Sequence, residues 1–209
     1  YHALGKLLRA SGKSVGVGDE GGFAPDMRDN SEVLETLSAA IEKAGYTTEQ
    51  IRFAMDAASS EWMEDSGKYT LPKAGGTMDS VDLIGVYEKL AEHFPIASLE
   101  DGLGEDDSIG WKSMTERLGN KMLLVGDDFF VTNPARLRDG IRQRLGNAIL
   151  IKPNQIGTLT ETMEVVQMAK NAGYRTILSH RSGETDDTTI ADLAVGLQTG
   201  YIKTGAPCR

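Results

Sequence analysis

The chain contains a single cysteine, Cys208, among 209 residues. One cysteine cannot form an internal disulfide, whereas small secreted domains held by disulfides carry several. The composition therefore excludes a disulfide scaffold and favours a reducing compartment. We expect a cytoplasmic protein in which Cys208 is an unpaired thiol near the end of the sequence.

Positive charge and long apolar runs are also scarce. Lys and Arg number 22 against 31 Asp and Glu, which gives a formal net charge of −9. Nucleic acids and anionic membrane surfaces both reward an excess of positive charge, so we expect neither as a partner. No apolar run approaches the roughly 18 residues of a membrane-spanning helix. Small-molecule ligands and metal cations fit this charge better.

Short apolar stretches with β-branched residues alternate with helical patterns along the chain. Strands are expected at residues 14–18, 52–57, 96–100, 122–126, 148–152, 175–179 and 201–205. Strand, helix and strand repeated this often predict an α/β fold with a mostly parallel sheet, either open or closed as a (β/α) barrel. The composition shows no break, so we expect one domain.

The expected helices have recognisable ends. Ser31 is the expected N-cap of a helix that stops at Gly45, and Asn133 is the expected N-cap of a helix with Pro134 in its first position. Later helices are expected to bury stripes of apolar residues, one of them formed by Leu159, Met163 and Val166. The polar segment 62–72 is expected to be a hairpin or an excursion from the fold.

The segment SVGVGDEGGFAP contains the pattern G-x-G-x-x-G at Gly16, Gly18 and Gly21. In a dinucleotide site the third glycine opens a helix whose N-terminus faces the pyrophosphate. Here Pro25 follows closely and disfavours helical geometry in the residue before it. Glu20 and its acidic neighbour would also place negative charge against a pyrophosphate. The pattern disfavours a dinucleotide site and leaves the role of Glu20 open.

An ionisable residue lies at or beside the end of every expected strand. In chain order these residues are Glu20, Asp56, Glu100, Asp127, Lys152, His180 and Lys203. Because the C-terminal ends of parallel strands share one face, the seven groups are expected to converge there. Any one of them taken alone is also explained by the solvation of loops, whereas the ordered set favours a site.

Three of these residues, Asp56, Glu100 and Asp127, offer only oxygen ligands. Such a set suits a hard cation such as Mg²⁺ better than zinc, which prefers His and Cys. Asp101 and Asp128 directly follow two of the proposed ligands. If the strand is still extended there, both should point to its opposite side. We expect each of them either to support the ligands from behind or to be solvated.

Seven motifs, in this order and spacing, resemble the C-terminal barrel of the enolase family: GDEGGFAP, MDAASSE, LEDGLGEDD, GDDFFVTNP, KPNQIGTLTET, SHRSGETDDTTIADLAVGL and IKTGAPCR. The resemblance implies a TIM-type (β/α) barrel of the enolase kind, incomplete in this chain. Residues 1–209 would form part of the barrel domain, with the N-terminal capping domain and the first barrel strand outside the sequence. It further implies a Mg²⁺-dependent hydro-lyase that converts 2-phosphoglycerate to phosphoenolpyruvate in glycolysis and gluconeogenesis.

The resemblance also assigns roles to single residues. Lys152 corresponds to the general base that removes the C2 proton, and Glu20 to the acid that helps the C3 hydroxide to leave. The remaining assignments are Asp56, Glu100 and Asp127 as Mg²⁺ ligands, and His180, Arg181, Ser182 and Lys203 as substrate-binding residues. The resemblance implies a homo-oligomeric parent protein, and this chain by itself is expected to be inactive.

Two alternatives remain at this point. The first is another member of the enolase superfamily, such as a racemase or a sugar-acid dehydratase, which shares the carboxylate triad but arranges its bases differently. The second is a non-catalytic binding or structural protein on a barrel scaffold, because a fold alone does not fix function.

Overall fold

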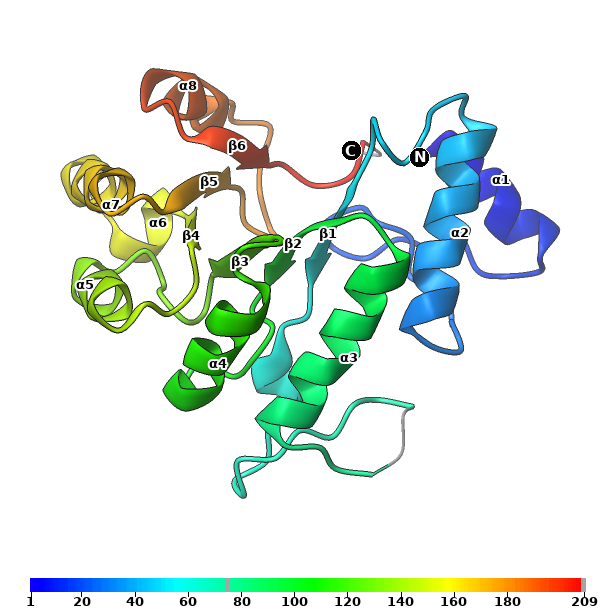
Figure 1. Ribbon diagram of the computed structural model, residues 1–209. Coiled ribbons are helices and arrows are strands. Elements are labelled where there is room, and N and C mark those ends of the chain that lie inside the picture. The colour runs from blue at the N-terminus through cyan, green and yellow to red at the C-terminus, as the bar shows by residue number, and fades with distance from the viewer. Residues whose placement is uncertain (74–75, 208–209) are drawn as a thin grey trace.

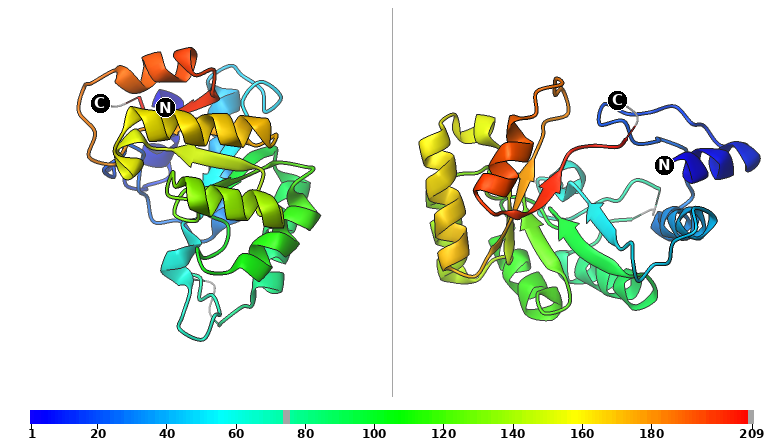
Figure 2. Two further views of the ribbon diagram at one scale, coloured as in Figure 1. Left: turned by 90° about the vertical axis from the view of Figure 1, so that its left-hand side faces the viewer. Right: turned by 90° about the horizontal axis from the view of Figure 1, so that it is seen from above.

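The computed structural model describes residues 1–73 and 76–207, so the expectation for Cys208 lies outside the described residues. Six parallel strands form one sheet in the order β1-β2-β3-β4-β5-β6. The strands are β1 Phe53–Asp56, β2 Ile96–Glu100, β3 Leu123–Gly126, β4 Ala148–Ile151, β5 Arg175–Ser179 and β6 Gly200–Lys203. The sheet curls around its own axis and stays open on one side (Figure 1; Figure 2, right).

Helices connect the strands and cover the outside of the curl. They are α1 His2–Ala10, α2 Asn30–Lys43, η1 Ser59–Trp62, α3 Ser80–His93, α4 Ser108–Leu118, α5 Pro134–Gln143, α6 Pro153–Ile156, α7 Leu159–Asn171 and α8 Thr189–Gly196. Helices α3, α4, α5, α7 and α8 lie along the convex face, whereas α1 and α2 lie beside each other beyond β1 (Figures 1 and 2). None of the described helices is long and apolar enough to cross a membrane.

This arrangement confirms the expected fold class. Six strands, parallel to their neighbours and joined through helices, form a curled half-barrel, which is an incomplete TIM-type (β/α) barrel over the described residues. Six of the seven expected strands are present, within one or two residues of the expected ends.

The strand expected at residues 14–18 is wrong. Val17 forms only an isolated antiparallel bridge with Phe23, and the Gly18 N–H donates to the Gly22 carbonyl at 2.9 Å. Gly21 adopts a φ of 81°, which glycine accepts without steric cost. The backbone therefore bonds to its own continuation instead of to a neighbouring strand, and the segment is a reversed loop that carries Glu20 at its tip.

Helix ends follow local capping chemistry. The Asn133 carboxamide accepts hydrogen bonds from the N–H groups of Ala135 and Arg136, and Pro134 opens α5, as expected. The expected cap at Ser31 is wrong, because the carboxylate of Asp29 accepts the N–H of Glu32 and α2 begins two residues earlier. Asp, Asn and Ser are all strong N-caps, so sequence alone does not choose between neighbours.

The stripe expected on α7 is wrong in part. Val166 is buried, but Leu159 and Met163 are half exposed. The buried face consists of Thr162, Val165, Val166 and Ala169. These positions also recur at helical spacing, but they lie on a different side of the helix from the expected stripe. The face that packs against the sheet is therefore not the one that carries the largest apolar side chains.

The polar segment after η1 is a hairpin, as expected. Met63 pairs with Tyr69, and Tyr69 pairs in turn with Met78, in isolated antiparallel bridges. The Tyr69 side chain is fully buried, and its hydroxyl donates to Asp107 at 2.8 Å. The excursion is therefore held against the start of α4.

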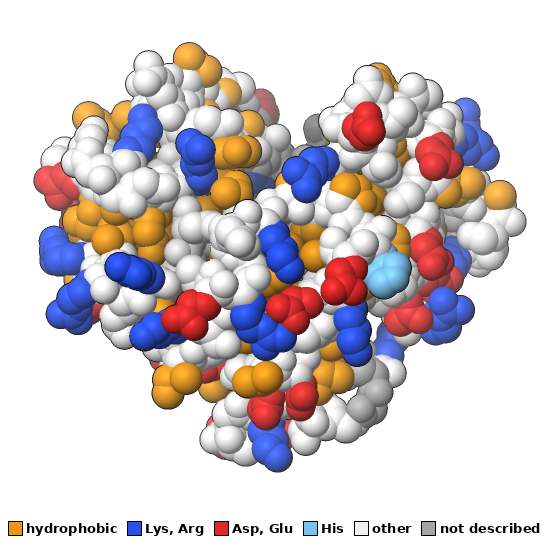
Figure 3. Space-filling view, viewed as in Figure 1, with side chains coloured by type: hydrophobic (Ala, Val, Ile, Leu, Met, Phe, Trp, Pro, Cys, Tyr) orange, Lys and Arg blue, Asp and Glu red, His pale blue; other side chains and the backbone are white. Residues whose placement is uncertain are grey.

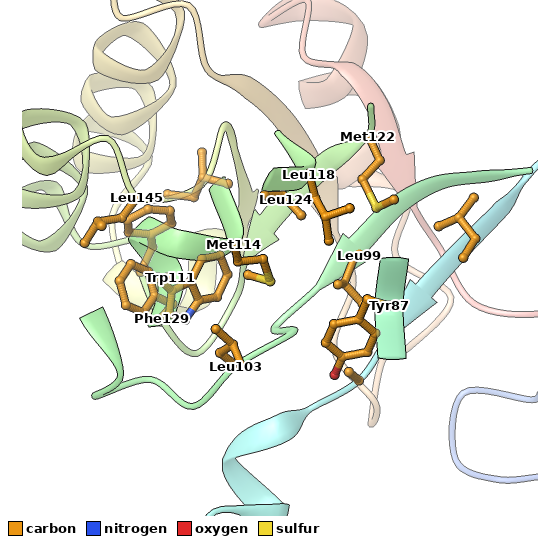
Figure 4. Packing of buried hydrophobic residues seen from close by; sticks show 14 of the residues in the cluster. Tyr87, Leu99, Leu103, Trp111, Met114, Leu118, Met122, Leu124, Phe129 and Leu145 are labelled. Carbon is orange, nitrogen blue, oxygen red and sulfur yellow. The ribbon is translucent and has the colours of Figure 1, made fainter. Parts of the chain in front are cut away.

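Aromatic packing fills the space between α4 and the sheet. Trp111 is fully buried, its ring stacks on Phe129 with centroids 4.4 Å apart, and its indole N–H donates to the Gly104 carbonyl. Figure 4 shows both rings among Leu103, Met114 and further apolar side chains. Trp111 is therefore a packing residue of the core.

Trp111→Ala is expected to lower the free energy of unfolding by about 3–5 kcal/mol, because it leaves a large cavity and removes a stacked ring. Urea unfolding measures the loss. The matched control is Ile109→Ala on the same helix, whose side chain is 87% exposed, and which should change stability by less than about 0.5 kcal/mol. Equal effects of the two changes would contradict the packing role.

Candidate active site

The ends of the six strands gather ionisable side chains at one rim of the half-barrel. Each strand contributes one residue, either its last residue or the one directly after it: Asp56, Glu100, Asp127, Lys152, His180 and Lys203. Because all six strands are parallel, these positions share the C-terminal edge of the sheet. The expected convergence is therefore present in the structure.

Lys203 joins two of the carboxylates. Its ammonium group donates to Asp56 Oδ2 and to Glu100 Oε1, each at 2.9 Å. Burial and the neighbouring charge of Asp56 raise the pKa of Glu100 to about 8, against the opposing effect of Lys203. Burial alone would lower the pKa of Lys203, but the charges of Glu100 and Asp56 outweigh it and raise that pKa. A single ammonium is thus shared by two crowded carboxylates.

Lys152 faces the third carboxylate. Its ammonium donates to Asp127 Oδ2 at 2.5 Å, and the other oxygen of Asp127 accepts the Gln155 amide at 3.2 Å. The Gln155 carbonyl oxygen accepts from the hydroxyl of Thr132, which also accepts the backbone N–H of Lys152. Thr132 is fully buried with a φ of 53°, an unusual conformation for a β-branched residue. One hydrogen-bonded chain therefore fixes both members of the ion pair.

Asp101 hydrogen-bonds to the backbone of a proposed ligand, which is one of the two expected outcomes, although its side chain does not follow the alternation of an extended strand. Its side chain is buried, and its oxygens accept the backbone N–H groups of Asp127 and Asp128 at 3.0 and 2.8 Å. Asp101 has a φ of 42°, so the strand has already ended and the alternation of side chains no longer applies. Burial, partly offset by these two hydrogen bonds, raises the pKa of Asp101 to about 7.

Asp128 is exposed, as expected for a solvated neighbour. Its carboxylate nevertheless belongs to a second acidic group, since Asp101, Asp127 and Asp128 each place one oxygen within 4.8 Å of the others. Although the residue as a whole is exposed, partial burial of its carboxylate and the charge of Asp127 raise the pKa of Asp128. Asp127 is thus common to two carboxylate sets, this one and the predicted set with Asp56 and Glu100.

The glycine-rich loop brings Glu20 to the same rim. The hydroxyl of Ser182 donates to Glu20 Oε1 at 3.1 Å, and His180 Nε2 lies 3.5 Å from Glu20 Oε2. The backbone carbonyl of Glu20 accepts the Ala206 N–H at 3.0 Å, which holds the loop beside the segment after β6. A Cβ atom on Gly205 would lie 3.0 Å from that carbonyl and 3.0 Å from His180, so this close approach needs glycine.

His180 carries an unsatisfied nitrogen. Its side chain is buried, and its Nε2 has no hydrogen-bond partner among the described residues, because 3.5 Å to Glu20 is beyond a good hydrogen bond. Buried polar atoms without a partner are rare in native structures. The nitrogen points toward Glu20, where a bound ligand could supply the missing partner.

Arg181 lies next to this group on the exposed side. Its guanidinium donates to the side-chain oxygen of Asn154 at 3.1 Å, which links the loop after β5 to α6. All nine predicted residues are therefore placed around the C-terminal ends of the strands. The sequence did not single out Gln155, Thr132 and Asn154, although two of them stand in the motif KPNQIGTLTET.

The site suits a divalent cation by the chemistry of its donors. Asp56, Glu100 and Asp127 offer only carboxylate oxygens, which Mg²⁺ prefers. Lysine ammonium groups contact all three of them, so positive charge already occupies the space between the carboxylates. A divalent cation would satisfy these carboxylates while freeing the two lysines.

A separate cavity lies away from this rim. Its volume is about 580 Å³, and its walls come mainly from α1, α2 and apolar side chains such as Phe23, Trp62 and Leu71. None of the nine predicted site residues lines it. The outer face seen in Figure 3 shows acidic and basic side chains interspersed across its middle, without a broad basic patch there.

The chain matches the sequence model of a known protein family. A sequence model described as "Enolase, C-terminal TIM barrel domain" matches residues 1–209. The match covers every segment that contributes a residue to the rim.

Proposed function

The chain belongs to the family of enolase C-terminal TIM barrel domains, and from this premise we propose that it carries the active site of an enolase, which dehydrates 2-phosphoglycerate to phosphoenolpyruvate. The single observation that carries the proposal is the pairing at the rim. Two lysines face three carboxylates there, and an acid, Glu20, lies beside an unsatisfied histidine.

Lys152 is the proposed general base. A lysine or histidine base working with Mg²⁺ is the known pattern of enolase-superfamily sites, so this assignment follows the family as well as the geometry. In the ion pair with Asp127 the ammonium has no lone pair for a proton. Away from Asp127, the neutral amine of Lys152 would accept the C2 proton of the substrate.

Glu20 is the proposed acid for the departing C3 hydroxyl. It lies on the glycine-rich loop, at the same rim of the half-barrel as Lys152. The Ser182 hydroxyl donates to one of its oxygens, and His180 Nε2 lies 3.5 Å from the other. A positioned carboxylic acid contributes by giving a proton to the leaving oxygen as the bond breaks.

Binding groups surround this acid and base. Arg181 and Ser182 offer donors for the substrate phosphate, and the unsatisfied Nε2 of His180 offers one more. Lys203, once it no longer bridges Asp56 and Glu100, can contact the substrate carboxylate. Arginine and hydroxyl donors at a loop suit a phosphate because each phosphate oxygen accepts several hydrogen bonds.

Asp56, Glu100 and Asp127 are the proposed ligands of Mg²⁺, the proposed cofactor. When bound, Mg²⁺ stabilises the negative charge that develops on the substrate carboxylate after proton loss. The three residues close neighbouring strands, β1, β2 and β3, so the sheet itself sets their spacing.

We further propose that residues 1–209 are the barrel portion of a longer, homo-oligomeric enzyme. A closed barrel of this type takes about 250 residues, and the described part supplies six strands. The proposed setting is the cytoplasm, where glycolysis and gluconeogenesis operate. The acidic composition supports a small-molecule substrate and no nucleic-acid partner.

The whole expressed protein with Mg²⁺ should convert 2-phosphoglycerate to phosphoenolpyruvate, and a chelator should stop the reaction until Mg²⁺ is restored. Product formation is followed by ultraviolet absorbance, with unphosphorylated sugar acids and other hydroxy acids as comparison substrates. Turnover of those acids without turnover of 2-phosphoglycerate would place the protein elsewhere in the superfamily. No turnover of any of them would favour a binding protein.

A further inference from the structure

Asp101 connects the ends of three strands. Its backbone carbonyl accepts the N–H of Ser59, beyond β1, at 3.0 Å, and its own N–H donates to the Val125 carbonyl on β3 at 2.9 Å. Its carboxylate accepts the N–H groups of Asp127 and Asp128 at 3.0 and 2.8 Å. Asp101 itself directly follows β2. Backbone and side chain together therefore join β1, β2 and β3.

These three strands are the ones that end in the proposed cation ligands. Asp56 closes β1, Glu100 closes β2 and lies next to Asp101, and Asp127 is held through its own N–H. A cation site needs its ligands at fixed separations, and the groups that hydrogen-bond around the ligands commonly set those separations.

The backbone of Asp101 adopts an unfavourable conformation while it makes these hydrogen bonds. Asp101 has a φ of 42°, a left-handed conformation that L-residues rarely adopt and that Asp and Asn tolerate best. The residue is 4% exposed, and among the described residues its carboxylate takes part in no ion pair. Its hydrogen bonds to Asp127 and Asp128 are therefore what compensates for burying the carboxylate.

We propose that Asp101 is a positioning residue that fixes the spacing of Asp56, Glu100 and Asp127 for the binding of a divalent cation without contacting the cation itself. This inference rests on the proposed function. It assigns the second acidic group, formed by Asp101, Asp127 and Asp128, a structural purpose: the carboxylate of Asp101 serves two backbone amides and is not a third ligand.

The test replaces Asp101 by Asn in the whole expressed protein. Asparagine accepts the left-handed conformation but has one acceptor oxygen in place of two, so one of the two N–H groups loses its partner. Mg²⁺ binding, measured by calorimetry, should weaken about 10- to 100-fold, as is typical when a group that orients a ligand is lost. Hydrogen exchange at the amides of Asp127 and Asp128 should become faster, and higher Mg²⁺ concentrations should restore turnover.

Two further variants separate positioning from general destabilisation and from direct ligation. Asn147→Ala removes side-chain hydrogen bonds to Leu124, Gly119 and Met122 at the opposite end of β3. It should lower the melting temperature and leave Mg²⁺ affinity at the wild-type value. Asp128→Asn keeps the backbone N–H that Asp101 binds, so it too should leave the affinity near the wild-type value.

The outcomes distinguish the two proposals. If the wild-type protein does not bind Mg²⁺, both the proposed function and this inference fail. If it does bind and Asp101→Asn binds equally well, only the inference fails. An equal loss in Asp128→Asn would show that Asp101, Asp127 and Asp128 are ligands, which overturns the positioning role. If Asp101→Asn does not fold, hydrogen exchange in the wild-type protein tests the inference. Exchange at the amides of Asp127 and Asp128 as fast as in exposed loops would overturn the positioning role.

Discussion

Replacing Lys152 by alanine in the whole expressed protein is expected to abolish the exchange of the substrate C2 proton with solvent. The amine ends β4 and lies against Asp127, and it is the proposed acceptor of that proton. General-base catalysis contributes about 10²- to 10⁴-fold, so the rate should fall by at least that range. Exchange is measured by incubating 2-phosphoglycerate with Mg²⁺ in deuterated water and following loss of the C2 proton signal by nuclear magnetic resonance.

A second substitution separates the two roles that Lys152 can have. Lys152→Arg keeps a positive charge opposite Asp127 but gives a group that does not lose its proton in proteins. It should therefore retain Mg²⁺ binding and still lack exchange. Lys112→Ala, on the exposed side of α4, is the matched control and should behave like the wild type. Wild-type exchange in the Arg variant would show that Lys152 acts as a counter-charge and not as a base.

Much of the rim could be predicted because the signal is local to each strand. At β4, four consecutive apolar residues are fully buried, and the charged Lys152 follows them directly. The same change from apolar to ionisable marks the ends of the other strands. A parallel sheet then brings residues far apart in sequence to one edge, so the convergence follows from topology and needs no knowledge of side-chain geometry.

The conformation of the glycine-rich loop could not be predicted from sequence, because a segment forms a strand only where a neighbouring strand offers hydrogen-bond partners. Residues 14–18 have the composition of a short strand, but every backbone N–H and carbonyl needs a partner that sequence does not name. In the structure the hydrogen bonds of Gly16 and Gly18 run to Ala24 and Gly22. Glu20 nevertheless lies at the rim, as expected, because the loop returns to the same edge of the sheet. The Ala206 N–H donates to the Glu20 carbonyl and holds the loop there.

The hydrogen bonds that orient the rim are invisible to sequence patterns for a related reason. Thr132 and Gln155 are 23 residues apart, and Asp101 bonds to amides 26 and 27 residues away. Periodicity describes residues within one element, whereas these contacts join loops of different strands. For Asp101 the expected alternation also failed, because a left-handed residue turns the chain directly after Glu100.

Replacing Glu20 by glutamine should stop the formation of phosphoenolpyruvate while exchange of the C2 proton continues. Removal of that proton precedes loss of the C3 hydroxide, and only the second step needs an acid at C3. Glutamine keeps the shape of the side chain and an oxygen for the Ser182 hydroxyl, but it cannot donate a proton as an acid can. The loss of product formation should be about 10²- to 10⁴-fold.

The contrast with Lys152→Ala makes this result specific, since that variant should lose both exchange and product formation. Both reactions are followed in one sample, with exchange measured by nuclear magnetic resonance and product by ultraviolet absorbance. Ser182→Ala is the matched control for disturbance of the loop, because it removes the hydrogen bond to Glu20 and leaves the acid intact. It should slow product formation less than Glu20→Gln does. If Glu20→Gln loses exchange as completely as Lys152→Ala, the two residues act in the same step and the division of roles is wrong.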